Sequence, residues 1–220
     1  MVSLSLLVEI LPLALGAAVS PLVLILQVML LGRSTQGLGP SWGFAAGASL
    51  VVAGWTLAGL LLGHALPPRT PGPDPVAAVV HLVLALLLLT LGLAIQQGRL
   101  VHASVVGAEG APLSVRRGLL IGTGSMATNL TSLVLFLPAL QDLARAQPSL
   151  PTEVLLVGLM ALITLLPALA PPALVWLWGA PGRRTLERLA PWMAQHQRRI
   201  QALLCFGFAG FLALKGISGL

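Results

Sequence analysis

The stretch Gly16-Ala17-Ala18-Val19-Ser20-Pro21 interrupts the first hydrophobic segment of the chain, and Gly124-Ser125-Met126-Ala127-Thr128-Asn129 interrupts a later one. When the second stretch is placed 108 positions after the first, Ser20-Pro21 aligns with Thr128-Asn129. Three hydrophobic segments separate the starts of the two stretches, so the segments that carry them cross a membrane in opposite directions. Helix-breaking residues at matching places in two inverted halves indicate the substrate site of a transporter.

Composition also indicates a membrane protein. Hydrophobic residues make up 57% of the chain and charged residues 8%, against roughly a quarter charged in soluble domains. Hydropathy predicts six segments, at residues 4–31, 41–64, 76–97, 117–143, 152–178 and 198–217. We therefore predict an all-α polytopic membrane protein with six transmembrane helices. They form two inverted three-helix repeats within one membrane domain, over residues 1–110 and 111–220.

Basic residues are unevenly divided between the two sides of the predicted membrane. Nine lie in the loops after the first, third and fifth segments: Arg33, Arg99, Arg116, Arg117, Arg183, Arg184, Arg188, Arg198 and Arg199. Three lie on the other side: Arg69, Arg145 and Lys215. The positive-inside rule places the odd loops in the cytoplasm and both termini outside. This anchoring accounts for the net charge of +6, so we do not expect nucleic acid to be a partner.

The two polar interruptions are the candidate substrate site. Pro21 has no N–H and therefore releases the carbonyl of Ala17, while the side chain of Asn129 needs a protein, water or ligand partner in hydrocarbon. The candidate substrate-binding residues are Ser20, Pro21, Gln27, Thr128, Asn129, Thr131 and Ser132. A purely structural alternative stays open, in which the chain has a proline kink and an Asn–Ser hydrogen bond between helices.

The sequence also excludes several classes of site. No Asp or Glu falls near the middle of a predicted segment, as a divalent-cation path or a proton pump would require. The histidines lack metal-ligand spacing, and we interpret His64 and His81 as interfacial polar residues. No nucleophile-elbow, zinc-protease or nucleotide-binding motif is present. We expect no metal, no cofactor and no enzymatic activity.

Glycines in the second segment predict close helix packing. Gly43, Gly47 and Gly54 fall within about 40° of one another on a helical wheel, and Gly118 and Gly122 repeat the four-residue spacing at the start of the fourth segment. Small residues on one stripe let another helix backbone approach closely.

With its six segments, the chain resembles the lysine-exporter superfamily, and most closely its Sap-like branch of glycolipid- or peptidoglycolipid-addressing proteins of actinobacteria. The resemblance rests on residues 15–21, on Thr128-Asn129-Leu130, and on the stretch from Trp192 through Gly216. It covers essentially the whole chain. Where relatives often have Asn-Pro, this chain has Asn129-Leu130, so the Gly122-Thr123-Gly124 run must supply flexibility there. The resemblance implies a lipid or glycolipid exporter in the cytoplasmic (inner) membrane of a bacterium.

Three functions remain open. The first is export or flipping of a lipid or glycolipid, with Arg116 and Arg117 meeting its headgroup at the inner mouth. The second is export of an amino acid or another small polar solute. The third is an accessory role beside a larger export system, and a homodimer is also possible. For transport we expect alternating access, in which one three-helix unit rocks against the other about the two interruptions.

Overall fold

The computed structural model describes the whole chain except residues 1–3, 34–37, 69–71, 73, 99–113 and 220. The regular secondary structure of the described residues is entirely helical, which confirms the all-α class. In chain order they are α1 (Leu4–Ala18), α2 (Pro21–Arg33), α3 (Gly39–Ala65), α4 (Pro75–Gln96), α5 (Val115–Ala127), α6 (Leu130–Arg145), α7 (Leu150–Trp178) and α8 (Ala180–Ser218). The predicted boundary between the repeats, at residues 110 and 111, lies outside the described residues, as do Arg69 and Arg99.

Four of these helices are long and apolar enough to cross a membrane without a break. They are α3, α4, α7 and the part of α8 from Pro191 to Ser218. Even the shortest, α4 with 22 residues, is about 33 Å long at 1.5 Å per residue, which matches a hydrocarbon core of about 30 Å. Two bent pairs, α1 with α2 and α5 with α6, pass the same test together. The described residues thus contain four candidate spans, or six if each bent pair is one span.

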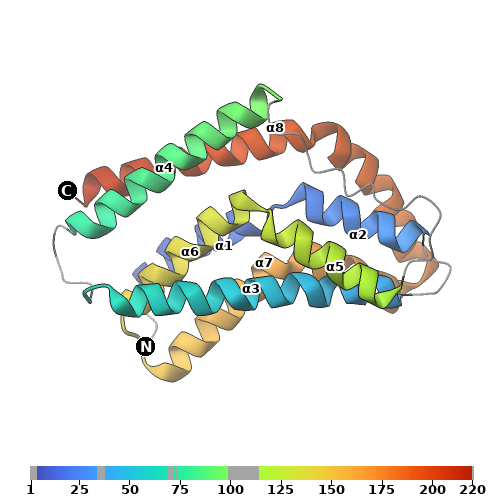
Figure 1. Cartoon of the computed structure of the whole chain (residues 1–220), viewed down its shortest axis with the longest axis horizontal. Coiled ribbons are helices and arrows are strands. Elements are labelled where there is room, and N and C mark those ends of the chain that lie inside the picture. The colour runs from blue at the N-terminus through green and yellow to red at the C-terminus, as the bar shows by residue number, and fades with distance from the viewer. Residues whose placement is uncertain (1–3, 34–37, 69–71, 73, 99–113, 220) are drawn as a thin grey trace.

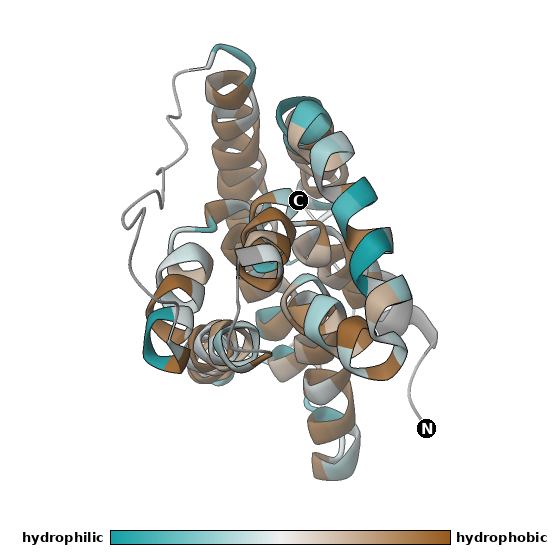
Figure 2. Cartoon of the chain, turned by 90° about the vertical axis from the view of Figure 1, so that its right-hand side faces the viewer, coloured by the Kyte–Doolittle hydropathy of each residue, from teal (hydrophilic) through white to brown (hydrophobic). Residues whose placement is uncertain are grey.

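The helices form a bundle in which α4 lies along α8, α3 along α5, and α1 along α6. The two termini lie at the same end of the bundle, and the starts of α5 and α8 lie at the other end (Figure 1). Hydrophobic residues dominate the helices, while hydrophilic residues concentrate in a few turns (Figure 2). Among the described residues, the larger of two buried hydrophobic clusters, which includes Leu13, Phe44, Leu88 and Phe136, connects α1, α3, α4 and α6.

The predicted glycine contact joins α3 to α5. A Cβ added to Gly43 or Gly47 would overlap a backbone carbonyl of α5, and a Cβ added to Gly118 or Gly122 would overlap one of α3. The two backbones therefore touch over two helical turns. Gly54 has no atom within 4 Å of such a Cβ, so its assignment to the contact is wrong. The stripe ends earlier because α3 turns to α6 beyond this point.

The helix that was predicted to begin at residue 198 begins at Ala180 instead. Residues 179–199 were expected to be a connection that contains an interfacial amphipathic segment with helical spacing, interrupted at Pro191. Gly179, with φ of 60°, makes the turn after α7, and Pro181 lies in the first turn of α8, where proline's missing N–H costs nothing. Pro191 lies inside the helix without ending it.

Candidate functional site

Both interruptions are two-residue breaks between helices. Val19 and Ser20 separate α1 from α2 at an angle of 42°, and Thr128 and Asn129 separate α5 from α6 at 70°. Each break ends in a residue whose carbonyl accepts the first hydrogen bond of the next helix: Leu24 N–H donates to Ser20 (3.2 Å), and Leu133 N–H to Asn129 (3.1 Å). The sharper break, between α5 and α6, contains no proline. The glycines before it and the capping side chain of Asn129 are therefore enough to end one helix and begin the next.

The positions of these caps correct the alignment of the two stretches by one residue. Ser20 corresponds to Asn129, and Pro21, the first residue of α2, corresponds to Leu130, the first residue of α6. Asn is among the best helix N-caps, and the Asn129 Oδ1 accepts from the N–H of Ser132 at 3.3 Å. Proline disfavours the helical conformation in the residue before it, which ends α1 ahead of Ser20.

The two breaks are in direct contact. The side-chain amide of Asn129 donates to the hydroxyl of Ser20 at 2.8 Å. The hydroxyl of Ser132 donates to the carbonyl of Ala17 at 2.7 Å, which is the carbonyl that Pro21 was predicted to release. Ser20 and Ser132 are buried, while Asn129 is half-buried. We call Ser20, Asn129, Ser132 and the Ala17 carbonyl the break contact.

Four other predicted residues do not join the break contact, and Gln27 is the one that lies furthest from it along the chain. Thr128 is exposed, and its hydroxyl donates to Gly124 of its own helix at 2.8 Å. Thr131 is buried on another face of α6, where its side chain neighbours the thiol of Cys205 on α8. Pro21 is buried at the start of α2.

Gln27 lies two turns further along α2, where it is fully buried. Its amide nitrogen donates to the carbonyl of Ala168 at 2.5 Å and to that of Ser41 at 3.0 Å. The carbonyl of Ala168 has no helical partner because residue 172 is a proline. Gln27 therefore bridges α2, α3 and α7 and supplies a partner to a carbonyl that the proline leaves unpaired.

Arg116 and Arg117 are exposed in the first turn of α5, at the end of the bundle away from the termini. Twelve residues of helix separate Arg117 from Asn129, a distance of about 18 Å along the axis. Arg116 and Arg117 therefore do not touch the break contact.

Sequence reasoning missed a second polar site at the end where the termini lie. We call it the charge cluster: Asp74, His81, Asp142, Arg145 and Lys215. Asp142 contacts Lys215 at 2.6 Å and His81 at 3.4 Å. Arg145 pairs with Asp74 and donates to the carbonyl of Pro67 at 2.9 Å.

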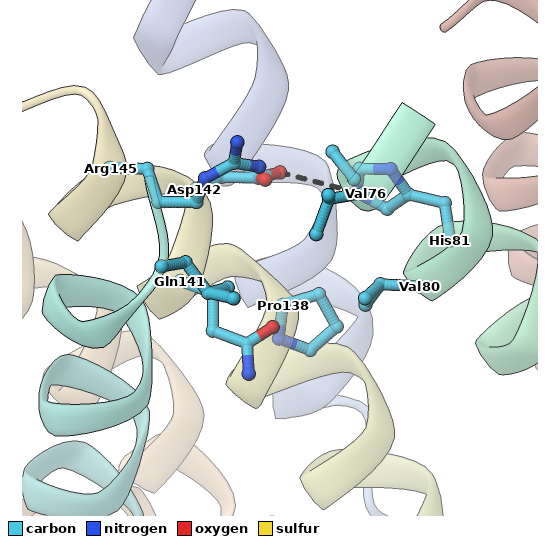
Figure 3. Close-up of a pocket in the computed structure, with 9 residues that line it drawn as sticks. Val76, Val80, His81, Pro138, Gln141, Asp142 and Arg145 are labelled. Carbon is cyan, nitrogen blue, oxygen red and sulfur yellow. Dashed lines mark ion pairs between the residues drawn. The ribbon is translucent and has the colours of Figure 1, made fainter. Parts of the chain in front are cut away.

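These charges are unusually buried for side chains at a helix end. Asp142 is 8% exposed, Arg145 6% and His81 4%. The depth of His81 in the membrane stays a prediction, but its burial and its partner were not predicted: it points from α4 toward Asp142 on α6 (Figure 3). The available signal was that isolated ionisable residues in apolar helices are rarely placed without a partner. Within the described residues, no three His, Cys, Asp or Glu side chains are grouped closely enough to hold a metal ion.

Comparison with known protein families gives a match that covers residues 10–218. It is the family described as Sap, sulfolipid-1-addressing protein. The searches of curated proteins and of solved structures found no match. Because the match spans nearly the whole chain, this protein belongs to the Sap, sulfolipid-1-addressing protein family.

Proposed function

We propose that the protein is a transporter, and not an enzyme, that moves a lipid or glycolipid across the bacterial inner membrane. The observation that carries this proposal is the break contact, in which two broken helices meet through Ser20 and Asn129. Broken helices that face each other near the middle of a membrane are a common way to build a transport site. Membership of a sulfolipid-addressing family supports a lipid as the substrate class.

The chemistry of the break contact suits a hydroxyl-rich headgroup. Each break brings together the last carbonyls of one helix and the first amides of the next, so acceptors and donors lie side by side. A hydroxyl both donates and accepts, so it can exchange partners with Ser20, Asn129 and Ser132. The tails of a lipid stay in the bilayer, so only the headgroup needs polar groups along its path.

The proposed movement follows from the packing of α3 on α5. These helices belong to different proposed inverted repeats, yet their backbones touch through four glycines. Rocking of two rigid three-helix units would have to separate them. We therefore assign alternating access to bending at the two breaks, with α3 and α5 moving together.

Orientation completes the proposal. The arginines at the starts of α5 and α8 lie at one end of the bundle, which we assign to the cytoplasm by the positive-inside rule. Both termini and the charge cluster then lie outside. Arg116 and Arg117 would meet an anionic headgroup as it enters.

The first experiment is mass spectrometry of the molecules that co-purify with the protein in mild detergent. A defined lipid, enriched over bulk membrane in the wild type and reduced in Asn129→Ala, is the expected result. Thr56→Val is the matched control, since that hydroxyl bonds only to its own helix, at Val52. Bulk lipid alone, unchanged by Asn129→Ala, would contradict the proposal and favour a small polar solute, which an amino-acid efflux assay then tests.

A further inference from the structure

The charge cluster borders a cavity that the proposed crossing point does not use. The cavity has a volume of about 200 Å³ and is lined by Asp74, His81, Asp142, Arg145, Lys215 and Ser218, among others. A water molecule takes up about 30 Å³ in the liquid, so the space exceeds what one or two bridging waters would need. It lies between α4, α6 and α8 at the end of the bundle that carries the termini.

Three nitrogen-bearing side chains, of Arg145, Lys215 and His81, border this cavity. A guanidinium has five N–H donors, and the bonds that Arg145 makes to described residues occupy two of them, at Pro67 and at Asp74. The ammonium of Lys215 and the ring of His81 meet the same carboxylate oxygen of Asp142. The two carboxylates thus hold three nitrogen groups at the border of the cavity.

We propose that this cavity binds an anionic group, such as a sulfate, phosphate or carboxylate, carried by a lipid headgroup or free in solution. Arg145 provides the principal contact because its planar fork matches two oxygens of such a group. Lys215 and His81 border the same space from α8 and α4. Asp74 and Asp142 orient the cations while the cavity is empty and oppose the bound anion.

If an anion binds here, neutralising one acidic residue of the cluster should strengthen its binding. Asp74→Asn removes the carboxylate that competes for Arg145. It also keeps the cap of α4, in which Asp74 accepts from the N–H of Ala77 at 3.0 Å, since Asn caps helices as well as Asp does. A carboxylate within a few ångströms of a bound anion repels it enough that its removal should tighten binding by on the order of tenfold.

The second variant removes the anion's main contact without leaving a buried charge alone. Asp74→Asn combined with Arg145→Gln deletes both partners of the ion pair, which avoids the large penalty of an unpaired buried charge. We expect this double variant to lose binding. If it does not fold, Asp74→Asn alone decides the question.

The test uses the full-length protein and two probes. Sodium sulfate, at ionic strength held constant with chloride, is titrated against the protein in neutral detergent, and the shift of the unfolding midpoint gives the affinity. Phosphatidylglycerol is compared with phosphatidylcholine in nanodiscs, with bound lipid counted by native mass spectrometry. A response to sulfate identifies a free anion, and a response to phosphatidylglycerol alone identifies a headgroup.

Either response supports the proposal if Asp74→Asn strengthens it and the double variant abolishes it. If the cluster only holds helices together, Asp74→Asn weakens or leaves unchanged the binding of both probes, and the proposal is overturned. Retention of binding by a folded double variant overturns it as well. These measurements need no transport, so they succeed or fail independently of the proposed function.

Discussion

The hydrogen bond between Asn129 and Ser20 can be measured by a double-mutant cycle. The four proteins are the wild type, Ser20→Ala, Asn129→Ala and the double variant. The bond is the direct side-chain link between the two breaks, at 2.8 Å. If it holds the breaks together, the two single changes must cost more in sum than the double change costs.

The structure sets the expected sizes. Asn129 also caps α6 through its Oδ1, at 3.3 Å from the Ser132 nitrogen, and loss of an Asn cap costs about 1 kcal/mol. A side-chain hydrogen bond between membrane helices contributes about 0.6 kcal/mol on average. Asn129→Ala should therefore lower the free energy of unfolding by about 1.6 kcal/mol, and Ser20→Ala by about 0.6 kcal/mol. The coupling energy should be about 0.6 kcal/mol and no more than about 1.7 kcal/mol.

Unfolding in mixed detergent micelles, followed by the fluorescence of the five tryptophans, gives the four free energies. Ser20→Ala paired with Thr56→Ala is the control cycle, because Thr56 bonds to Val52 of its own helix. That cycle should be additive. Additivity in the Ser20–Asn129 cycle too would refute the claim that this bond joins the breaks, whatever the single variants cost.

Three further predictions concern stability. Gly118→Leu should destabilise the protein by more than about 4 kcal/mol, since the new side chain meets the backbone of α3. Gly54→Ala, where the added Cβ meets nothing, should stabilise it by up to about 1 kcal/mol. Equal effects of the two changes in thermal unfolding would disprove the close approach of α3 and α5. Lys215→Met should lower the free energy of unfolding by about 3–5 kcal/mol, because it leaves Asp142 buried without its ammonium partner. Asp142→Asn in the same protein should restore most of that loss in the same assay. If the second change restores nothing, the two side chains are not coupled. Gln27→Leu should cost about 1–3 kcal/mol, because the carbonyl of Ala168 loses its donor, and a denaturant midpoint equal to the wild type's would rule out the bridge.

The spans and the two breaks could be predicted from sequence because they depend on local properties. Apolar length identifies membrane helices, and a proline identifies the carbonyl that it frees. The release of the Ala17 carbonyl by Pro21 was thus predicted, but its partner, Ser132, was not. The predicted alignment of the two stretches was shifted by one residue. It paired Gly16 with Gly124, whereas the starts of α2 and α6 pair Ser20 with Asn129.

The charge cluster could not be predicted because its members converge only in three dimensions. His81, Asp142 and Lys215 lie on α4, α6 and α8, and more than sixty positions separate each from the next. Sequence placed Asp142 and Lys215 near the ends of their helices, but the rotation of each helix about its axis is set by packing. For example, the side chains of Cys205 and Phe206 on α8 pack against Gly92 of α4. The same reasoning explains Thr131, which neighbours Ser132 in sequence yet faces Cys205.

The separation of neutral and charged groups also bears on where a headgroup would be held. The break contact offers Ser20, Asn129 and Ser132 without a formal charge, so an ionic headgroup would gain little there against the cost of leaving water. The charge cluster offers Arg145, which is buried, and Lys215, which is partly exposed, both held by carboxylates. A headgroup that carries both hydroxyls and an anion would bind weakly at the crossing point and more tightly at the end with the termini. That difference in affinity would hold such a headgroup longer at the end with the termini than at the crossing point.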